Sequence, residues 1–242
     1  MNARETDACT HRTDRVSVTL FTDESALITI DSPRHGQALP VDARTLAATI
    51  CRDADDELRQ LLPGLPPDIV VSCSLGTHVV PGIGCGATAM DSRTIALVVK
   101  PSSTSTVEQI LRDHLRHLLF HECHHLVRGW VRRGGMRRRH FIDGVICEGL
   151  ASAFERDAAG HAAPWCEYPE DVRAWVDELL ALPLLADYRH WMFHHPDGRQ
   201  WIGYKAGTYI TDRAIARSGL DAATLVSVPA ERILELAGLP QP

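Results

Sequence analysis

The chain has 242 residues, a formal net charge of −6 and 45% hydrophobic residues, which are ordinary values for a globular protein. This length allows one well-buried core, and the mildly negative charge gives no sign of a nucleic-acid or membrane-surface partner. The seven cysteines are scattered and form no CxxC pair, which argues against a disulfide framework and favours a reducing cytoplasm. The N-terminus lacks the apolar stretch of a signal peptide, and no apolar run reaches the roughly 20 residues of a membrane span.

The first part of the chain is predicted to be rich in strands. Residues 1–14 are expected to form a disordered tail, and residues 15–242 a single domain whose strand-rich part covers 15–101. Apolar residues at helical spacing predict a helix over 41–62, which ends at a Pro-Gly stop signal, and turn residues predict a loop over 76–86. Short β-prone runs predict strands at 16–20, 26–30, 68–75 and 94–100.

The remainder, residues 102–242, is predicted to be helical. Thr106 marks a plausible start for the first helix, Asp143 can cap the second, and an arginine-rich loop over 131–139 separates them. Strands followed by helices are typical of an α+β fold. Helices are predicted at about 106–130, 143–160, 170–181, 199–218 and 229–237.

The first of these helices contains the motif HExxH in His121-Glu122-Cys123-His124-His125. Helix positions i and i+4 share one face, so His121 and His125 can bind one ion. Glu122 lies about 100° round the helix, where a carboxylate can take a proton from metal-bound water. The motif also occurs by chance, and the alternative interpretation is a histidine-rich helix surface that binds no metal.

A catalytic zinc ion needs three protein ligands and one open position. The pattern HExxHxxGxxH is absent, because Arg128 and Val131 occupy its glycine and third histidine positions. Glu148 lies in the next predicted helix, where Gly149 would allow the two ligand helices to approach closely. The sequence therefore predicts one zinc ion bound by His121, His125 and Glu148.

Several neighbouring residues compete for supporting roles. Glu155 lies on the same helix face as Glu148 and could orient a ligand, although a structural salt bridge is favoured. Ser152 could hydrogen-bond a ligand histidine, and Cys123 is expected to be a core residue. Three further histidines could form an accessory metal site, although a surface or supporting role is favoured: His114, His117 and His124.

These motifs resemble gluzincin-type metallopeptidases, and more specifically the YjaZ-like family of predicted Zn-dependent proteases. The resemblance rests on the HExxH motif, the Glu148-Gly149-Leu150-Ala151 block and the Gly203-Tyr204-x-x-Gly207-x-Tyr209-Ile210 segment. It implies a zincin-like fold, with a small N-terminal mixed sheet, an active-site helix and a helical C-terminal half.

Peptide hydrolysis also needs a group that stabilises the developing oxyanion. Tyr204 or Tyr209 is predicted to donate this hydrogen bond, with aromatic packing as the alternative and His140 as a weaker candidate. The 94–99 run would make an edge strand to which an extended peptide could add. The arginine-rich loop could attract acidic substrates, although a solvated loop is favoured.

The predicted function is that of a zinc-dependent peptidase acting on a peptide or protein substrate, with Glu122 activating a zinc-bound water. The alternative is a non-catalytic zinc-binding regulatory or interaction module that keeps a peptidase fold. A structural zinc site is weaker, because only three good ligands are evident and such sites normally have four. The natural substrate, endo- or exopeptidase action and the oligomeric state stay open.

Overall fold

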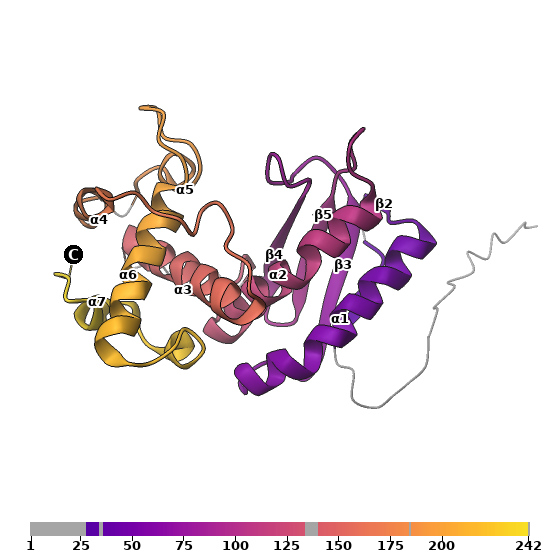
Figure 1. Cartoon of the computed structure of the whole chain (residues 1–242), viewed down its shortest axis with the longest axis horizontal. Helices are drawn as coiled ribbons and strands as arrows, with labels where there is room; N and C mark the ends of the chain where they lie inside the picture. Colours follow the sequence, from indigo (N-terminus) through magenta and orange to yellow (C-terminus); the bar gives the residue numbers. More distant parts are fainter. Residues whose placement is uncertain (1–27, 34–35, 134–139, 184, 242) are drawn as a thin grey trace, which may run out of the picture.

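A computed structural model describes residues 28–33, 36–133, 140–183 and 185–241 of the chain. The predicted tail and the β-prone run at 16–20 lie outside these residues. The helices and strands are, in chain order, β1 (Ile28–Asp31), β2 (Gln37–Ala38), α1 (Val41–Leu61), β3 (Ile69–Leu75), β4 (Cys85–Asp91), β5 (Thr94–Val99), α2 (Val107–Arg128), α3 (Phe141–Ala159), α4 (Val172–Leu180), α5 (Tyr188–Met192), α6 (Ile202–Ser218), a 3-10 turn (Thr224–Ser227) and α7 (Ala230–Ala237). The fold is thus mixed, with the named strands all before α2 (Figure 1).

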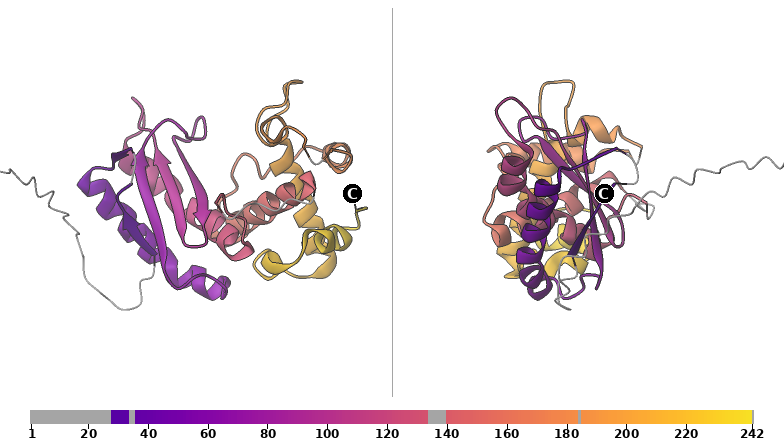
Figure 2. Two further views of the ribbon diagram at one scale, coloured as in Figure 1. Left: turned by 180° about the vertical axis from the view of Figure 1, so that it is seen from behind. Right: turned by 90° about the vertical axis from the view of Figure 1, so that its right-hand side faces the viewer.

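The strands form one small mixed sheet in the order β1-β3-β5-β4, and the short β2 pairs with the C-terminal end of β3. β1, β3 and β5 are parallel, whereas β4 is antiparallel to β5. Buried residues alternate along β3 and β5. This alternation is explained by α1 and α2, which cover one face of the sheet (Figures 1 and 2).

The edge strand differs from the prediction. Thr94–Val99 is not an edge, because it lies between β3 and β4, and the edge strand on this side of the sheet is Cys85–Asp91. The sequence of β5, TIALVV, is apolar and β-branched as expected of a central strand. The sequence of β4, CGATAMD, contains glycine and alanine, which are poor strand formers. Pairing with β5 therefore stabilises a strand that local propensity does not predict.

The starts of α2 and α3 are set by capping boxes. In α2, Thr106 and Gln109 exchange hydrogen bonds as the sequence suggests. In α3 the N-cap is His140 and not Asp143. Asp143 lies instead in the first turn, where its carboxylate accepts the His140 backbone N–H at 3.1 Å. A negative side chain at this position is stabilised by the helix dipole.

The two larger hydrophobic cores lie side by side. One core packs the sheet, α1 and α2, and includes Ala153 and Phe154 from one side of α3. The other core packs α3, α4, α6 and α7, and includes Val145, Ile146 and Leu150 from the N-terminal half of α3, whereas Ala153 and Phe154 belong to its C-terminal half. α3 is therefore shared by both cores, and Glu148 lies in the half of α3 that packs in the helical core.

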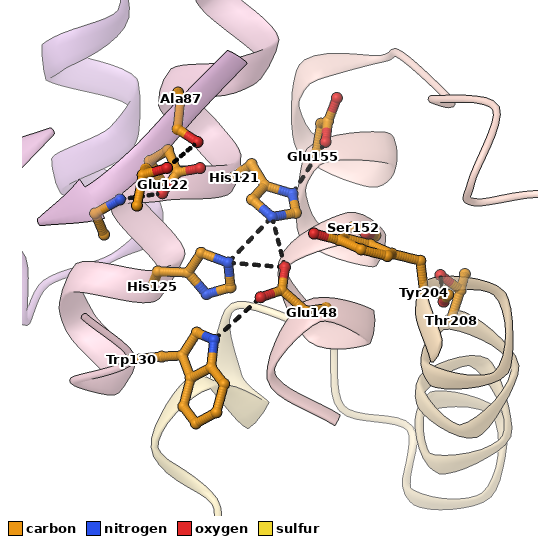
Figure 3. A network of polar contacts seen from close by, with 12 residues as sticks. Ala87, His121, Glu122, His125, Trp130, Glu148, Ser152, Glu155, Tyr204 and Thr208 are labelled. Atoms are coloured by element: carbon orange, nitrogen blue, oxygen red, sulfur yellow. Dashed lines mark hydrogen bonds and ion pairs between the residues drawn. The ribbon is translucent and has the colours of Figure 1, made fainter. Parts of the chain in front are cut away.

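α3 and α6 cross backbone to backbone at two glycines. A Cβ atom added to Gly149 would lie 2.1 Å from the carbonyl carbon of Gly207, and one added to Gly207 would lie 2.2 Å from the carbonyl oxygen of Val145. The close approach that Gly149 permits is thus to α6 and not to α2. This crossing brings Tyr204, one turn before Gly207, alongside the helix that carries Glu148 (Figure 3).

Candidate metal centre

Two imidazoles face each other near the end of α2. His121 and His125 lie one turn apart, so their side chains leave the helix in nearly the same direction. They are almost completely buried, with 6% and 4% of their surfaces exposed. Their Nε2 atoms are 3.1 Å apart and their rings are inclined at 83°. Two ring nitrogens at this distance need a proton or a cation between them.

The Glu148 carboxylate, carried by α3, reaches the same point. Its Oε2 atom is 3.3 Å from His121 Nε2 and 3.2 Å from His125 Nε2 (Figure 3). A tetrahedral ion with bonds of about 2.0 Å needs ligand atoms that lie about 3.3 Å from one another. The three donor atoms have this spacing, and they form the one such group found among the described residues. The donor set therefore fits a zinc ion.

The electrostatics of the site favour a positive charge. Burial alone would lower the pKa of His121, but hydrogen bonds to Glu148 and Glu155 outweigh it and raise that pKa to about 10. Burial likewise would raise the pKa of Glu148, but the two imidazoles lower it below its ordinary value. The carboxylate stays ionised in a buried position, as a metal ligand must.

A second carboxylate contacts one of the two imidazoles. The sequence favours a structural role for Glu155, but its Oε2 atom is 3.2 Å from His121 Nδ1. His121 thus has Nδ1 against Glu155 and Nε2 against Glu148, the arrangement in which outer carboxylates of metal sites hold a histidine ligand. Ser152 makes no hydrogen bond to either imidazole within the described ranges; its Oγ atom and the Nδ1 atom of His125 are buried without a partner.

Glu122 lies beside the three donors and against the edge strand. Its side chain is buried, and its Oε2 atom accepts the backbone N–H of Ala89 in β4 at 2.6 Å. Burial raises the pKa of this carboxyl group, although the neighbouring imidazoles and the Ala89 N–H oppose the shift. A carboxylate whose pKa is raised is better able to accept and hold a proton than an ordinary glutamate.

The two candidate tyrosines have different surroundings. The hydroxyl of Tyr204 points towards Glu148 and His121 (Figure 3). Burial and the charge of Glu148 raise the pKa of Tyr204 well above its ordinary value, so the phenol stays protonated. The ring of Tyr209 packs edge-on against Tyr168, and its hydroxyl accepts a 3.5 Å hydrogen bond from Arg213. His140 is exposed at the start of α3.

The other histidines and the cysteine of the HExxH helix lie outside the three-donor group found among the described residues. His124 is fully buried, within 3.3 Å of the Ala222 carbonyl oxygen, so it is a core residue and not a surface one. His117 stacks on His161 with ring centroids 4.0 Å apart. Cys123 is fully buried, as the sequence predicts. Of the arginine-rich loop, only residues 131–133 are described.

One contact of the site is missed by sequence reasoning. The indole Nε1 of Trp130 donates a 3.0 Å hydrogen bond to Glu148 Oε1, the carboxylate oxygen that does not face the imidazoles. The available signal is its position, directly after the Gly129 that ends the HExxH helix. The indole N–H of a tryptophan at this position can reach residues near the second histidine of the motif.

Comparison with known proteins supports these observations. No curated protein gives a significant match to the chain. Within the described ranges, no helix has both the length and the apolarity to cross a membrane. A family model described as "Predicted Zn-dependent protease (DUF2268)" matches residues 85–235. This match begins at β4 and includes the HExxH helix, α3 and α6. The chain belongs to this family of predicted zinc-dependent proteases.

Proposed function

We propose that this protein is a zinc-dependent peptidase with a zincin-like active site, in which one ion is held by His121, His125 and Glu148. The observation that carries the proposal is the triangle of two imidazole nitrogens and one carboxylate oxygen, with sides of 3.1, 3.2 and 3.3 Å. Three protein ligands leave one coordination position open for water or substrate, as catalytic zinc sites do.

Glu122 is the general base of the proposed reaction. Zinc bound at such a site lowers the pKa of water and polarises the substrate carbonyl. Glu122 accepts the proton from the attacking water and then delivers it to the leaving amine. Its raised pKa lets it hold this proton between the two steps. The Ala89 N–H fixes the orientation of the carboxylate.

Tyr204 is the proposed donor to the oxyanion. The negative charge that develops on the carbonyl oxygen needs a hydrogen bond formed in the transition state. The Tyr204 hydroxyl points towards the metal ligands (Figure 3), and its raised pKa keeps the phenol protonated. Tyr209 has its hydroxyl engaged by Arg213 instead.

The outer edge of β4 is the proposed binding site for an extended peptide. Cys85 and Ala89 use their outward backbone groups internally, because Val80 N–H binds the Cys85 carbonyl and Arg132 N–H binds the Ala89 carbonyl. Ala87 lies between them and faces outward in the same alternation. No hydrogen bond of its N–H is found among the described residues, so we propose that this N–H pairs with a substrate strand, beside the general base Glu122.

The test begins with metal analysis of the purified full-length protein, followed by cleavage of a peptide library with and without a chelator. We expect about one zinc per chain and chelator-sensitive cleavage. Glu122→Gln should keep its zinc but lose turnover by about 100-fold or more, whereas Glu108→Gln, in the first turn of the same helix, should behave as wild type. Undiminished turnover by Glu122→Gln would refute the general-base assignment. A zinc-loaded protein inactive on the whole library would favour the non-catalytic module.

A further inference from the structure

The two oxygens of the Glu148 carboxylate have different partners. Oε2 faces the Nε2 atoms of His121 and His125, whereas Oε1 accepts the indole N–H of Trp130 at 3.0 Å (Figure 3). The indole nitrogen can only donate, so the direction of this hydrogen bond is fixed. A donor to an ionised carboxylate forms one of the stronger types of hydrogen bond.

The backbone of Trp130 is bound to another residue of the site. Gly129 adopts a left-handed conformation with φ of 74°, which favours glycine. The chain then turns so that the Trp130 N–H donates to the His125 carbonyl at 2.9 Å and the Gly129 N–H to the Leu126 carbonyl at 3.2 Å. This pair of bonds is a Schellman motif. The backbone of Trp130 is therefore fixed on one ligand residue while its side chain holds another.

The indole ring is also fixed against α3. A Cβ atom added to Gly144 would lie 3.3 Å from Trp130 Cζ2, so the ring contacts the backbone of α3 one turn before Glu148. The half-buried ring thus has a defined orientation, and its N–H has a defined target. Trp130 connects the end of α2 to the ligand-bearing turn of α3 through three separate contacts.

We infer that Trp130 is a positioning residue that holds Glu148 as a ligand through one oxygen and thereby sets the affinity and coordination number of the metal. This inference rests on the metal site of the proposed function. Without the indole N–H, Oε1 loses this hydrogen bond and can rotate towards the ion. A carboxylate bound through both oxygens would then compete for the position that a catalytic zinc keeps open.

The experiment compares three variants of the full-length chain. Trp130→Phe keeps an aromatic ring but removes the donor, whereas Trp130→His restores a ring N–H at nearly the same position and removes the larger ring. Trp175→Phe is the matched control, because Trp175 stacks under Arg199 in the helical region. Zn²⁺ affinity is measured by competition with a chromogenic chelator, and coordination by the visible absorption of the Co²⁺-substituted protein. Circular dichroism verifies folding.

We expect Trp130→Phe to bind Zn²⁺ about 10- to 100-fold more weakly than wild type, with a Co²⁺ spectrum shifted towards higher coordination. Trp130→His should recover most of the affinity, and Trp175→Phe should match wild type. Wild-type Zn²⁺ affinity and Co²⁺ spectrum in a folded Trp130→Phe protein would overturn the inference while leaving the proposed function intact. Equal losses in Trp130→Phe and Trp130→His would assign the effect to ring packing and also overturn it. Failure of the wild-type protein to bind Zn²⁺ would overturn the proposed function itself.

Discussion

The crossing of α3 and α6 predicts a large effect for Gly149→Ala. The added Cβ would meet the Gly207 backbone, with the carbonyl carbon at 2.1 Å, the carbonyl oxygen at 2.2 Å and the Cα at 2.5 Å. Backbone atoms cannot rotate away as a side chain can, so the two helices must separate by about 1 Å or more to restore ordinary van der Waals contact.

Two opposing contributions decide the size of this effect. Alanine is a better helix former than glycine by about 1 kcal/mol, which by itself would stabilise the variant. Overpacking costs about 1–3 kcal/mol, and the backbone clash at Gly149 belongs at the upper end of that range. We therefore expect a net loss of about 2 kcal/mol in the free energy of unfolding. The same displacement moves Tyr204 away from Glu148, and a shift of about 1 Å can cost roughly 100-fold in turnover.

Urea unfolding of the full chain, followed by far-UV circular dichroism, measures the loss in the free energy of unfolding. Gly144→Ala is the matched control in the same helix, because its Cβ would meet only side-chain atoms of Trp130 and Tyr188 at 3.3 Å. These rings need to shift by only a few tenths of an ångström, so its stability should stay within about 1 kcal/mol of wild type. If Gly149→Ala is as stable as wild type or more stable, the argument from the helix crossing is wrong.

Two further predictions concern a tyrosine and a histidine. Tyr204→Phe keeps the ring beside Trp201 but should lower kcat by about 100-fold or more at unchanged zinc content; full activity would show that another group binds the oxyanion. Burial and the neighbouring His161 lower the pKa of His117 from 6.5 to about 4, so the unfolded chain binds more protons in this range and stability falls as the pH falls through it. His117→Gln should reduce that loss of stability by roughly 1 kcal/mol, because partial exposure screens the effect. The free energy of unfolding of both proteins is measured in urea at about pH 7 and about pH 5. If it changes by the same amount in the wild type and in the variant, the prediction is wrong.

The parts of the site that depend on local geometry could be predicted from the sequence. The helical period brings His121 and His125 to one face, and the need for a third ligand selects Glu148 in the following helix. The start of α2 at Thr106 is equally local, because a capping box involves residues three positions apart.

The parts of the fold and of the site that depend on long-range packing could not be predicted from the sequence. β4 forms because β5 pairs with it, and its glycine and alanines give no local signal. The partner of Gly149 is Gly207 in a helix far along the chain. Once this crossing is known, Tyr204 can be distinguished from Tyr209, because positions i and i+3 of a helix share a face and Tyr204 is the tyrosine three positions before Gly207.

The sharing of α3 by two hydrophobic cores has a consequence for how the protein matures. The core around the sheet supplies both imidazoles, and the helical core fixes the segment that bears Glu148. A folding intermediate with only one core consolidated would hold an incomplete set of ligands. On the proposed function, hydrolytic activity therefore requires both cores to be packed, and any local unfolding that disrupts one of them removes a ligand from the site.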